Sequence, residues 1–161
     1  MAGETSLLPQ YYNDDFQVLS FPLITTAGVT DPLPILYADR DMVIDEIVVA
    51  VPVVGTGGTA TINFEISTNP LEQGGTSMCT INVDTANIVA GDTLVATTDN
   101  VLRYSLAGAL QTTAVGSTAI NGVTAGVQSN CIPKGSWLII DPNTATAARV
   151  IVQIRFRSRL K

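Results

Sequence analysis

Apolar and polar residues alternate over several stretches of the chain, most clearly in residues 60–68, ATINFEIST. There Ile62, Phe64 and Ile66 share one face, and polar side chains occupy the other. A period of two predicts a β-strand with one buried face and one wet face. The preceding GTGGT, residues 55–59, supplies the conformational freedom that a tight connection needs, so a hairpin with residues 42–54 is expected.

The same β-rich character recurs in residues 16–24, 33–38, 42–54, 77–83 and 148–160. Within MVIDEIVVAVPVV, residues 42–54, the β-branched run predicts a strand, and Pro52 near its end indicates an edge position or a bulge. No segment has the pattern of a long amphipathic helix. With glycine and proline between segments, the sequence predicts an all-β fold, a β-sandwich or jelly roll of about eight antiparallel strands.

The last segment, ARVIVQIRFRSRL, alternates as well. Its apolar face carries Val150, Val152, Ile154 and Phe156. On the other face, Arg155, Arg157 and Arg159 form a row at period two, a set of planar donors suited to carboxylates on a partner. The alternative is a charged strand edge that prevents aggregation.

The domain organisation divides into an N-terminal arm, residues 1–16, and a single β-sandwich domain, residues 17–161. The arm mixes polar residues with apolar anchors at Leu7, Leu8, Tyr11, Tyr12 and Phe16. It is either a frayed terminus or an arm that docks these anchors on a neighbouring molecule. Residues 107–128 are rich in small side chains and contain Asn121–Gly122, which predicts a weak hairpin or a loop excursion.

Two similar steps, IVAGDTLVA at residues 88–96 and NCIPKGSWLIIDPN at residues 130–143, raise the question of a site. Each step contains a glycine, Gly91 or Gly135, that allows the chain to reverse direction before an apolar strand. Both steps are therefore predicted to be turns at the corners of the sandwich. Trp137 is then a core or interface residue, although an aromatic face can also bind a sugar ring.

Composition limits the chemistry. The chain has no histidine, which removes the commonest general base and metal ligand, so triads that contain histidine are excluded and no cofactor is expected. Cys79 and Cys131 match no metal or redox spacing and are expected to be free thiols. No apolar run is long enough to span a membrane and no signal-peptide pattern is present, so synthesis and folding in a host cytoplasm are expected.

Charge is distributed unevenly. Residues 1–148 hold fourteen acids and only Arg40, Arg103 and Lys134, a net charge of −11, whereas residues 149–161 carry five cations and no acid. An acidic body disfavours nucleic acid as a partner. Two weaker hypotheses involve the acids: a calcium site, or a glycosidase-like carboxylate pair. The first would use Asp39, Asp41, Asp45 and Glu46, and the second two of Asp14, Asp15, Asp84, Asp92, Asp99 and Asp141.

A resemblance follows from three runs, residues 36–68, 88–97 and 131–156. They are LYADRDMVIDEIVVAVPVVGTGGTATINFEIST, IVAGDTLVAT and CIPKGSWLIIDPNTATAARVIVQIRF. In this order, over residues 33–158, the chain resembles the small decoration, or cement, proteins of tailed-bacteriophage heads. The resemblance implies a jelly-roll virion protein that forms a homotrimer on the outer surface of the head, binds the major capsid protein and stabilises the capsid.

The expected function is therefore structural and non-enzymatic, with the arm anchors and the arginine row as candidate partner-binding residues. One alternative is a carbohydrate-binding or adhesion module of a phage tail or fibre, which would use Trp137, Tyr37 and Tyr104. Another is a carboxylate-based glycan hydrolase, which the shortage of large polar side chains disfavours.

Overall fold

The computed structural model describes residues 16–25, 31–55, 60–71, 74–84, 88–111, 116–120, 130–143 and 148–158. Every regular element in these ranges is a β-strand, and none of them contains a helix that could cross a membrane. The strands are β1 (Gln17–Thr25), β2 (Leu33–Tyr37), β3 (Met42–Val53), β4 (Thr61–Ser67), β5 (Thr76–Asn82), β6 (Asp92–Ala96), β7 (Val101–Tyr104), β8 (Leu110–Gln111), β9 (Cys131–Ile132), β10 (Trp137–Asn143) and β11 (Ala148–Ser158).

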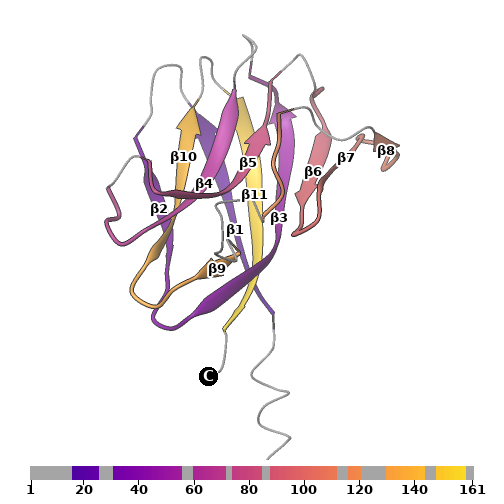
Figure 1. The fold of residues 1–161 in the computed structure, drawn as a ribbon. Helices are drawn as coiled ribbons and strands as arrows, with labels where there is room; N and C mark the ends of the chain where they lie inside the picture. Colours follow the sequence, from indigo (N-terminus) through magenta and orange to yellow (C-terminus); the bar gives the residue numbers. More distant parts are fainter. Residues whose placement is uncertain are drawn as a thin grey trace, which may run out of the picture.

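The strands form two antiparallel sheets packed face to face (Figure 1). Sheet A has the order β1-β11-β3-β6-β7-β8, with β9 paired to β3, and sheet B has the order β2-β10-β4-β5. Without β7, β8 and β9, the remaining strands pair as first-eighth-third-sixth and second-seventh-fourth-fifth. This is the order of a jelly roll, so the predicted all-β sandwich of about eight antiparallel strands is confirmed.

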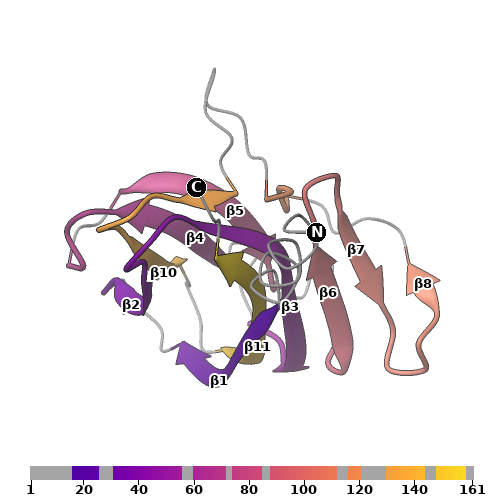
Figure 2. The ribbon, with the colours of Figure 1, turned by 90° about the horizontal axis from the view of Figure 1, so that it is seen from below.

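The three additional strands belong to the connection between β6 and β10. Figure 2 shows β7 and β8 extending sheet A beyond the width of sheet B. Their hairpin turns where the Gly108 N–H donates to the Ser105 carbonyl, so residues 107–111 of the predicted excursion belong to a hairpin. Residues 116–120 return to the sandwich, where Thr118 pairs with Thr80 and Ile120 is buried. Asn121–Gly122 lies outside the described residues.

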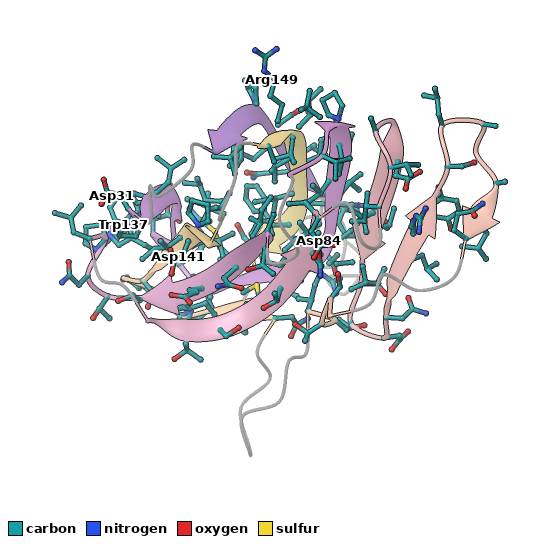
Figure 3. The ribbon with its side chains drawn as sticks, turned by 90° about the horizontal axis from the view of Figure 1, so that it is seen from above. Asp31, Asp84, Trp137, Asp141 and Arg149 are labelled. Carbon is teal, nitrogen blue, oxygen red and sulfur yellow. The ribbon has the colours of Figure 1, made fainter. Side chains whose placement is uncertain are left out.

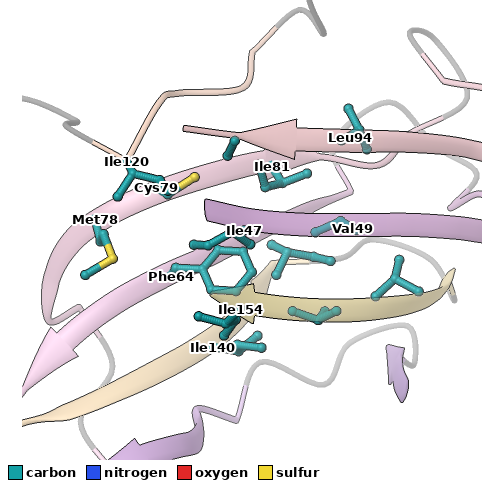
Figure 4. Packing of buried hydrophobic residues seen from close by; sticks show 14 of the residues in the cluster. Ile47, Val49, Phe64, Met78, Cys79, Ile81, Leu94, Ile120, Ile140 and Ile154 are labelled. Atoms are coloured by element: carbon teal, nitrogen blue, oxygen red, sulfur yellow. The ribbon is translucent and has the colours of Figure 1, made fainter. Parts of the chain in front are cut away.

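The core lies between the two sheets and follows the predicted alternation. In β11, Val150, Val152, Ile154 and Phe156 are all buried, while the residues between them are exposed. Phe64 of sheet B points at Ile47 and Ile154 of sheet A (Figure 4). Each fully buried side chain of this size contributes about 1.5–3 kcal/mol to folding, so this inner face is the main source of stability.

The two repeated steps are the same turn. In Val89–Asp92 and in Pro133–Ser136, the fourth residue's N–H donates to the first residue's carbonyl, at 3.1 Å in both cases. The third residue is a glycine with positive φ, 94° at Gly91 and 84° at Gly135. A type II turn requires this conformation at its third position, so the architectural interpretation of both steps is confirmed.

The expected hairpin between residues 42–54 and 60–68 is wrong, because β3 belongs to sheet A and β4 to sheet B. The chain therefore passes from one sheet to the other between these strands.

Two other local expectations gain detail. Pro52 lies in a bulge, because Arg149 and Ile151 pair with Val53 and Ala50, leaving an extra residue in β3. The outer face of β4 is not wet throughout, since Glu65 and Ser67 are buried. The chain leading into β5 covers this face, and the Gly75 N–H donates to Glu65 Oε2 at 2.9 Å.

Candidate docking surface

Two members of the arginine row, Arg155 and Arg157, lie on the outer face of β11 because the alternating residues fill the core. The Arg155 guanidinium carbon lies 3.7 Å from the centre of the Phe16 ring, and that of Arg157 lies 5.7 Å from it. Cations over an aromatic face are attracted to the ring's electrons. Phe16 directly precedes β1, which pairs with β11, so the end of the predicted arm and the arginine row meet at one corner of sheet A.

Two acids of β3 join this corner through a bulge. Arg155 pairs with Glu46 and Phe156 with Ile44, so Asp45 is an extra residue between them. Asp45 Oδ1 lies 3.5 Å from Arg157 Nη2, and its other carboxylate oxygen is buried without a hydrogen-bond partner. The pair is partly exposed, so it contributes no more than about 1 kcal/mol and leaves the arginine available to other carboxylates.

Beside this corner, the outer face of sheet A has a hollow lined by both apolar and polar side chains. A hollow of about 360 Å³ is lined by Phe16, Val18, Glu46, Val48, Gln153 and Arg155. Val48 pairs with Val95 and Val95 with Leu102, so the row of Val48 is apolar across β6 and β7. On its other side Val48 pairs with Gln153, and Gln153 with Ser20, so the row is polar across β11 and β1. We call Val18, Val48, Val95, Leu102 and Ile151 the apolar strip; Val18 and Ile151 are 64% and 45% exposed.

The candidate partner-binding residues fall into two groups. Phe16, Arg155 and Arg157 come together in the corner just described. Leu7, Leu8, Tyr11, Tyr12 and Arg159 lie outside the described residues.

The apolar strip was not predicted as part of a site, and Asp45 and Glu46 were predicted only as ligands of the calcium hypothesis, not as part of a docking surface. The adjacent acids in VIDEIVV interrupt the apolar pattern and could have indicated a bulge. The valines of the strip belong to runs that are apolar on both faces, so no pattern distinguishes their outer members.

Sheet B carries an aromatic pair on its outer face. Tyr37 and Trp137 are cross-strand partners with ring centres 4.9 Å apart and planes inclined at 51°. Trp137 is half-buried on the outer face, whereas Leu138 enters the core, so the alternative in which Trp137 is a core residue is wrong. Asp141 lies on the same face of β10 (Figure 3). Burial raises the pKa of its carboxyl. Tyr104 lies on β7 of the other sheet.

The proposed calcium ligands have separate partners. Asp39 accepts two hydrogen bonds from the Arg40 guanidinium, which lowers the pKa of that carboxyl. Asp41 accepts the Lys134 backbone N–H at 2.9 Å, and Asp45 pairs with Arg157. Within the ranges that the structure describes, no group of three or more metal-ligating side chains is gathered.

The carboxylates of the hydrolase hypothesis lie on different elements. Asp84 follows β5 and Asp92 begins β6, and both are buried. Asp99 lies in the exposed β6–β7 turn, and Asp141 is half-buried on β10. Asp14 and Asp15 lie outside the described residues.

The two cysteines are free thiols. Cys79 is fully buried, and its thiol donates to the Thr118 carbonyl at 3.0 Å. Burial raises the pKa of this thiol to about 12. Such a group is a poor nucleophile near neutral pH, so Cys79 belongs to the packing of the core.

Comparison with known proteins leaves the site to be interpreted from its geometry. No protein-family model matches the chain, and no curated protein sequence matches it significantly.

Proposed function

We propose that this chain is a structural, non-enzymatic virion protein that docks on the outer surface of a bacteriophage head and stabilises it. The observation that carries the proposal is the corner of sheet A, where Phe16, Arg155 and Arg157 adjoin the apolar strip. Aromatic and arginine side chains beside apolar surface are the usual composition of protein-binding hot spots. The jelly-roll order and the resemblance to head decoration proteins direct the choice of partner to a capsid subunit.

Each part of this corner has a role in docking. The guanidinium groups of Arg155 and Arg157 offer fork-shaped donors to carboxylates of the major capsid protein. The Phe16 ring limits how far the Arg155 guanidinium can move, so less side-chain freedom is lost on binding. In a homotrimer, three such corners would bridge neighbouring shell subunits, and a protein that binds only the assembled shell stabilises it by mass action.

Charge reversal on β11 tests the docking role. Arg155→Glu should weaken attachment to purified shells that lack the protein, and high salt should weaken wild-type attachment in the same direction. Arg149→Glu is the matched control, because Arg149 lies on the same face at the opposite end of β11 and projects away from the sandwich (Figure 3). Cosedimentation with shells measures the attachment of each variant and its dependence on salt. Equal attachment of the two variants and the wild type, at all salt concentrations, would contradict the proposal.

A second candidate function, glycan binding, is favoured by the Tyr37–Trp137 pair. Two aromatic rings on the outer face of a sheet can bind the apolar face of a sugar ring. Trp137→Ala should abolish signals on a glycan array if this function is real, whereas Tyr104→Ala on sheet A should leave them unchanged. An array without any Trp137-dependent signal removes this candidate.

A further inference from the structure

Exposed apolar side chains gather at the end of the sandwich where β3 stops. Val53, Val89 and Leu106 are 44%, 58% and 85% exposed, and they come from three segments that are far apart in the sequence. The Gly91 N–H donates to the Val51 carbonyl at 2.9 Å, which joins the second segment to β3. A Cβ on Gly91 would lie 3.1 Å from Leu106 Cβ, so the β7–β8 hairpin touches the same turn. We call this surface, defined by Val53, Val89 and Leu106, the apolar end.

A second hollow lies in the apolar end. Its volume is about 540 Å³, and the side chains that line it are all apolar: Pro52, Val53, Val54, Ile88, Val89 and Ala90. Hollows of about 300–1,000 Å³ with apolar linings commonly bind apolar groups. Ala90 directly precedes Gly91, which Leu106 contacts, so the hollow and the protruding leucine lie side by side. One end of the molecule therefore carries both an apolar projection and an apolar hollow.

The apolar end lacks charge. Three runs of the sequence form it, and none contains an acid or a base: residues 48–55, 88–91 and 104–111. Asp92, which follows the second run, is buried in its ion pair with Arg103. Arg149, opposite Val53 on β11, projects away from the sandwich (Figure 3). The whole chain has a net charge of −6, so two copies repel each other least where they meet through this end. Depletion of charge is also what distinguishes the centre of a protein interface from other surface.

We propose that the apolar end binds a second copy of this chain, with Leu106 of one copy in the hollow of the next. A second copy is the favoured partner because a single end supplies both the protruding leucine and the hollow, so identical surfaces complement each other. A contact of this kind is heterologous, and it closes into a ring when the rotation between copies divides a full turn. In a closed ring each copy makes the contact twice, which brings its buried area towards the value of about 800 Å² typical of a stable interface.

The inference deepens the proposed function, because it names the surface that would hold a homotrimer together. Only the number of copies rests on that function. Arg149 pairs with Val53 and Arg157 with Val43, so the apolar end and the corner that carries Phe16 lie at opposite ends of β3. Copies joined through the apolar end therefore leave that corner accessible to a capsid subunit.

Sedimentation velocity of the full-length protein over a range of micromolar concentrations tests the inference. The wild type should form an oligomer whose share rises with concentration. Leu106→Asp should raise the dissociation constant at least about a hundredfold, because a carboxylate would enter an apolar hollow without a partner. Leu71→Asp is the matched control, since Leu71 is 75% exposed in a connection of sheet B, and it should leave association unchanged. Melting temperatures equal to that of the wild type show that both variants fold.

A mixture of two variants tests the protruding leucine and the hollow separately. Val89→Asp blocks the hollow and keeps the leucine, whereas Leu106→Asp removes the leucine and keeps the hollow. Each variant alone should be a monomer. Their mixture should form pairs and no larger species, because one intact contact remains between the two variants.

Three results would overturn the inference: a monomeric wild type at every concentration, equal association of Leu106→Asp and Leu71→Asp, or a mixture that forms no pairs. The proposed function fails separately. A monomer that still attaches to shells would remove the inference and leave the function in place. An oligomer that depends on Leu106 but does not attach to shells would remove the function and support the inference.

Discussion

Replacing Arg103 should destabilise the fold far more than replacing any other cation described on the surface. Arg103 Nε donates to Asp92 Oδ2 at 2.7 Å, and the Val89 N–H donates to the same oxygen at 2.9 Å. The Asp92 side chain is only 1% exposed. Arg103→Met keeps an unbranched apolar side chain over the core but leaves the buried carboxylate without its cation.

The magnitude follows from that burial. Removing one partner of a buried ion pair costs about 3–5 kcal/mol, because an uncompensated charge remains away from water. A domain of this size has a total stability of about 5–15 kcal/mol. With a shift of about 2–4 °C per kcal/mol, Arg103→Met should lower the melting temperature by about 6–20 °C.

A double-mutant cycle in urea, followed by the fluorescence of Trp137, measures the coupling. Asp92→Asn removes the charge and keeps an acceptor for the Val89 N–H. The loss of unfolding free energy in the double variant should therefore be about 2–3 kcal/mol smaller than the sum of the losses in the two single variants. Additivity within about 0.5 kcal/mol, or a loss of less than 1 kcal/mol for Arg103→Met, as at an exposed pair, would refute the reasoning.

Two further predictions concern a turn and a thiol. Gly135→Ala should lower the free energy of unfolding by about 1–2 kcal/mol, from the positive φ alone, because a Cβ there meets no atom. Gly91→Ala should lower it more, because its Cβ would lie 3.1 Å from Leu106 Cβ. Equal losses of stability in thermal unfolding would contradict this difference. The Cys79 thiol has a pKa raised from 9.0 to about 12, so its contribution to stability is fully present below pH 9 and is lost as the pH rises towards 12. Urea unfolding between pH 8 and 11 should show this decline in the wild type and less of it in Cys79→Val, and parallel curves would refute it.

Much of the sandwich could be predicted because its strands are locally encoded. The alternation in β11 determines which side chains enter the core, and the glycines of the two type II turns mark where the chain reverses. These patterns extend over only a few residues, so they can be recognised in the sequence without knowing the order of strands in the sheets.

The docking corner could be predicted only in part, because it depends on register. Phe16 and Arg155 are far apart in the sequence and meet through the pairing of β1 with β11. The bulge that brings Asp45 towards Arg157 depends on how β3 pairs with β11. A weak hairpin was one of two alternatives for residues 107–128, but its pairing with β7 could not be predicted, since the two-residue strand β8 is stabilised by pairing rather than by a pattern of its own.

We propose that the protein stabilises a bacteriophage head from its outer surface. The decisive experiment takes expanded shells, lacking the protein, of the phage proposed to encode it, adds the purified full-length protein, and measures the temperature at which the shells disrupt. We expect saturable binding and a rise in the disruption temperature. Shells that bind none of the protein, or that disrupt at an unchanged temperature when saturated with it, would contradict the account.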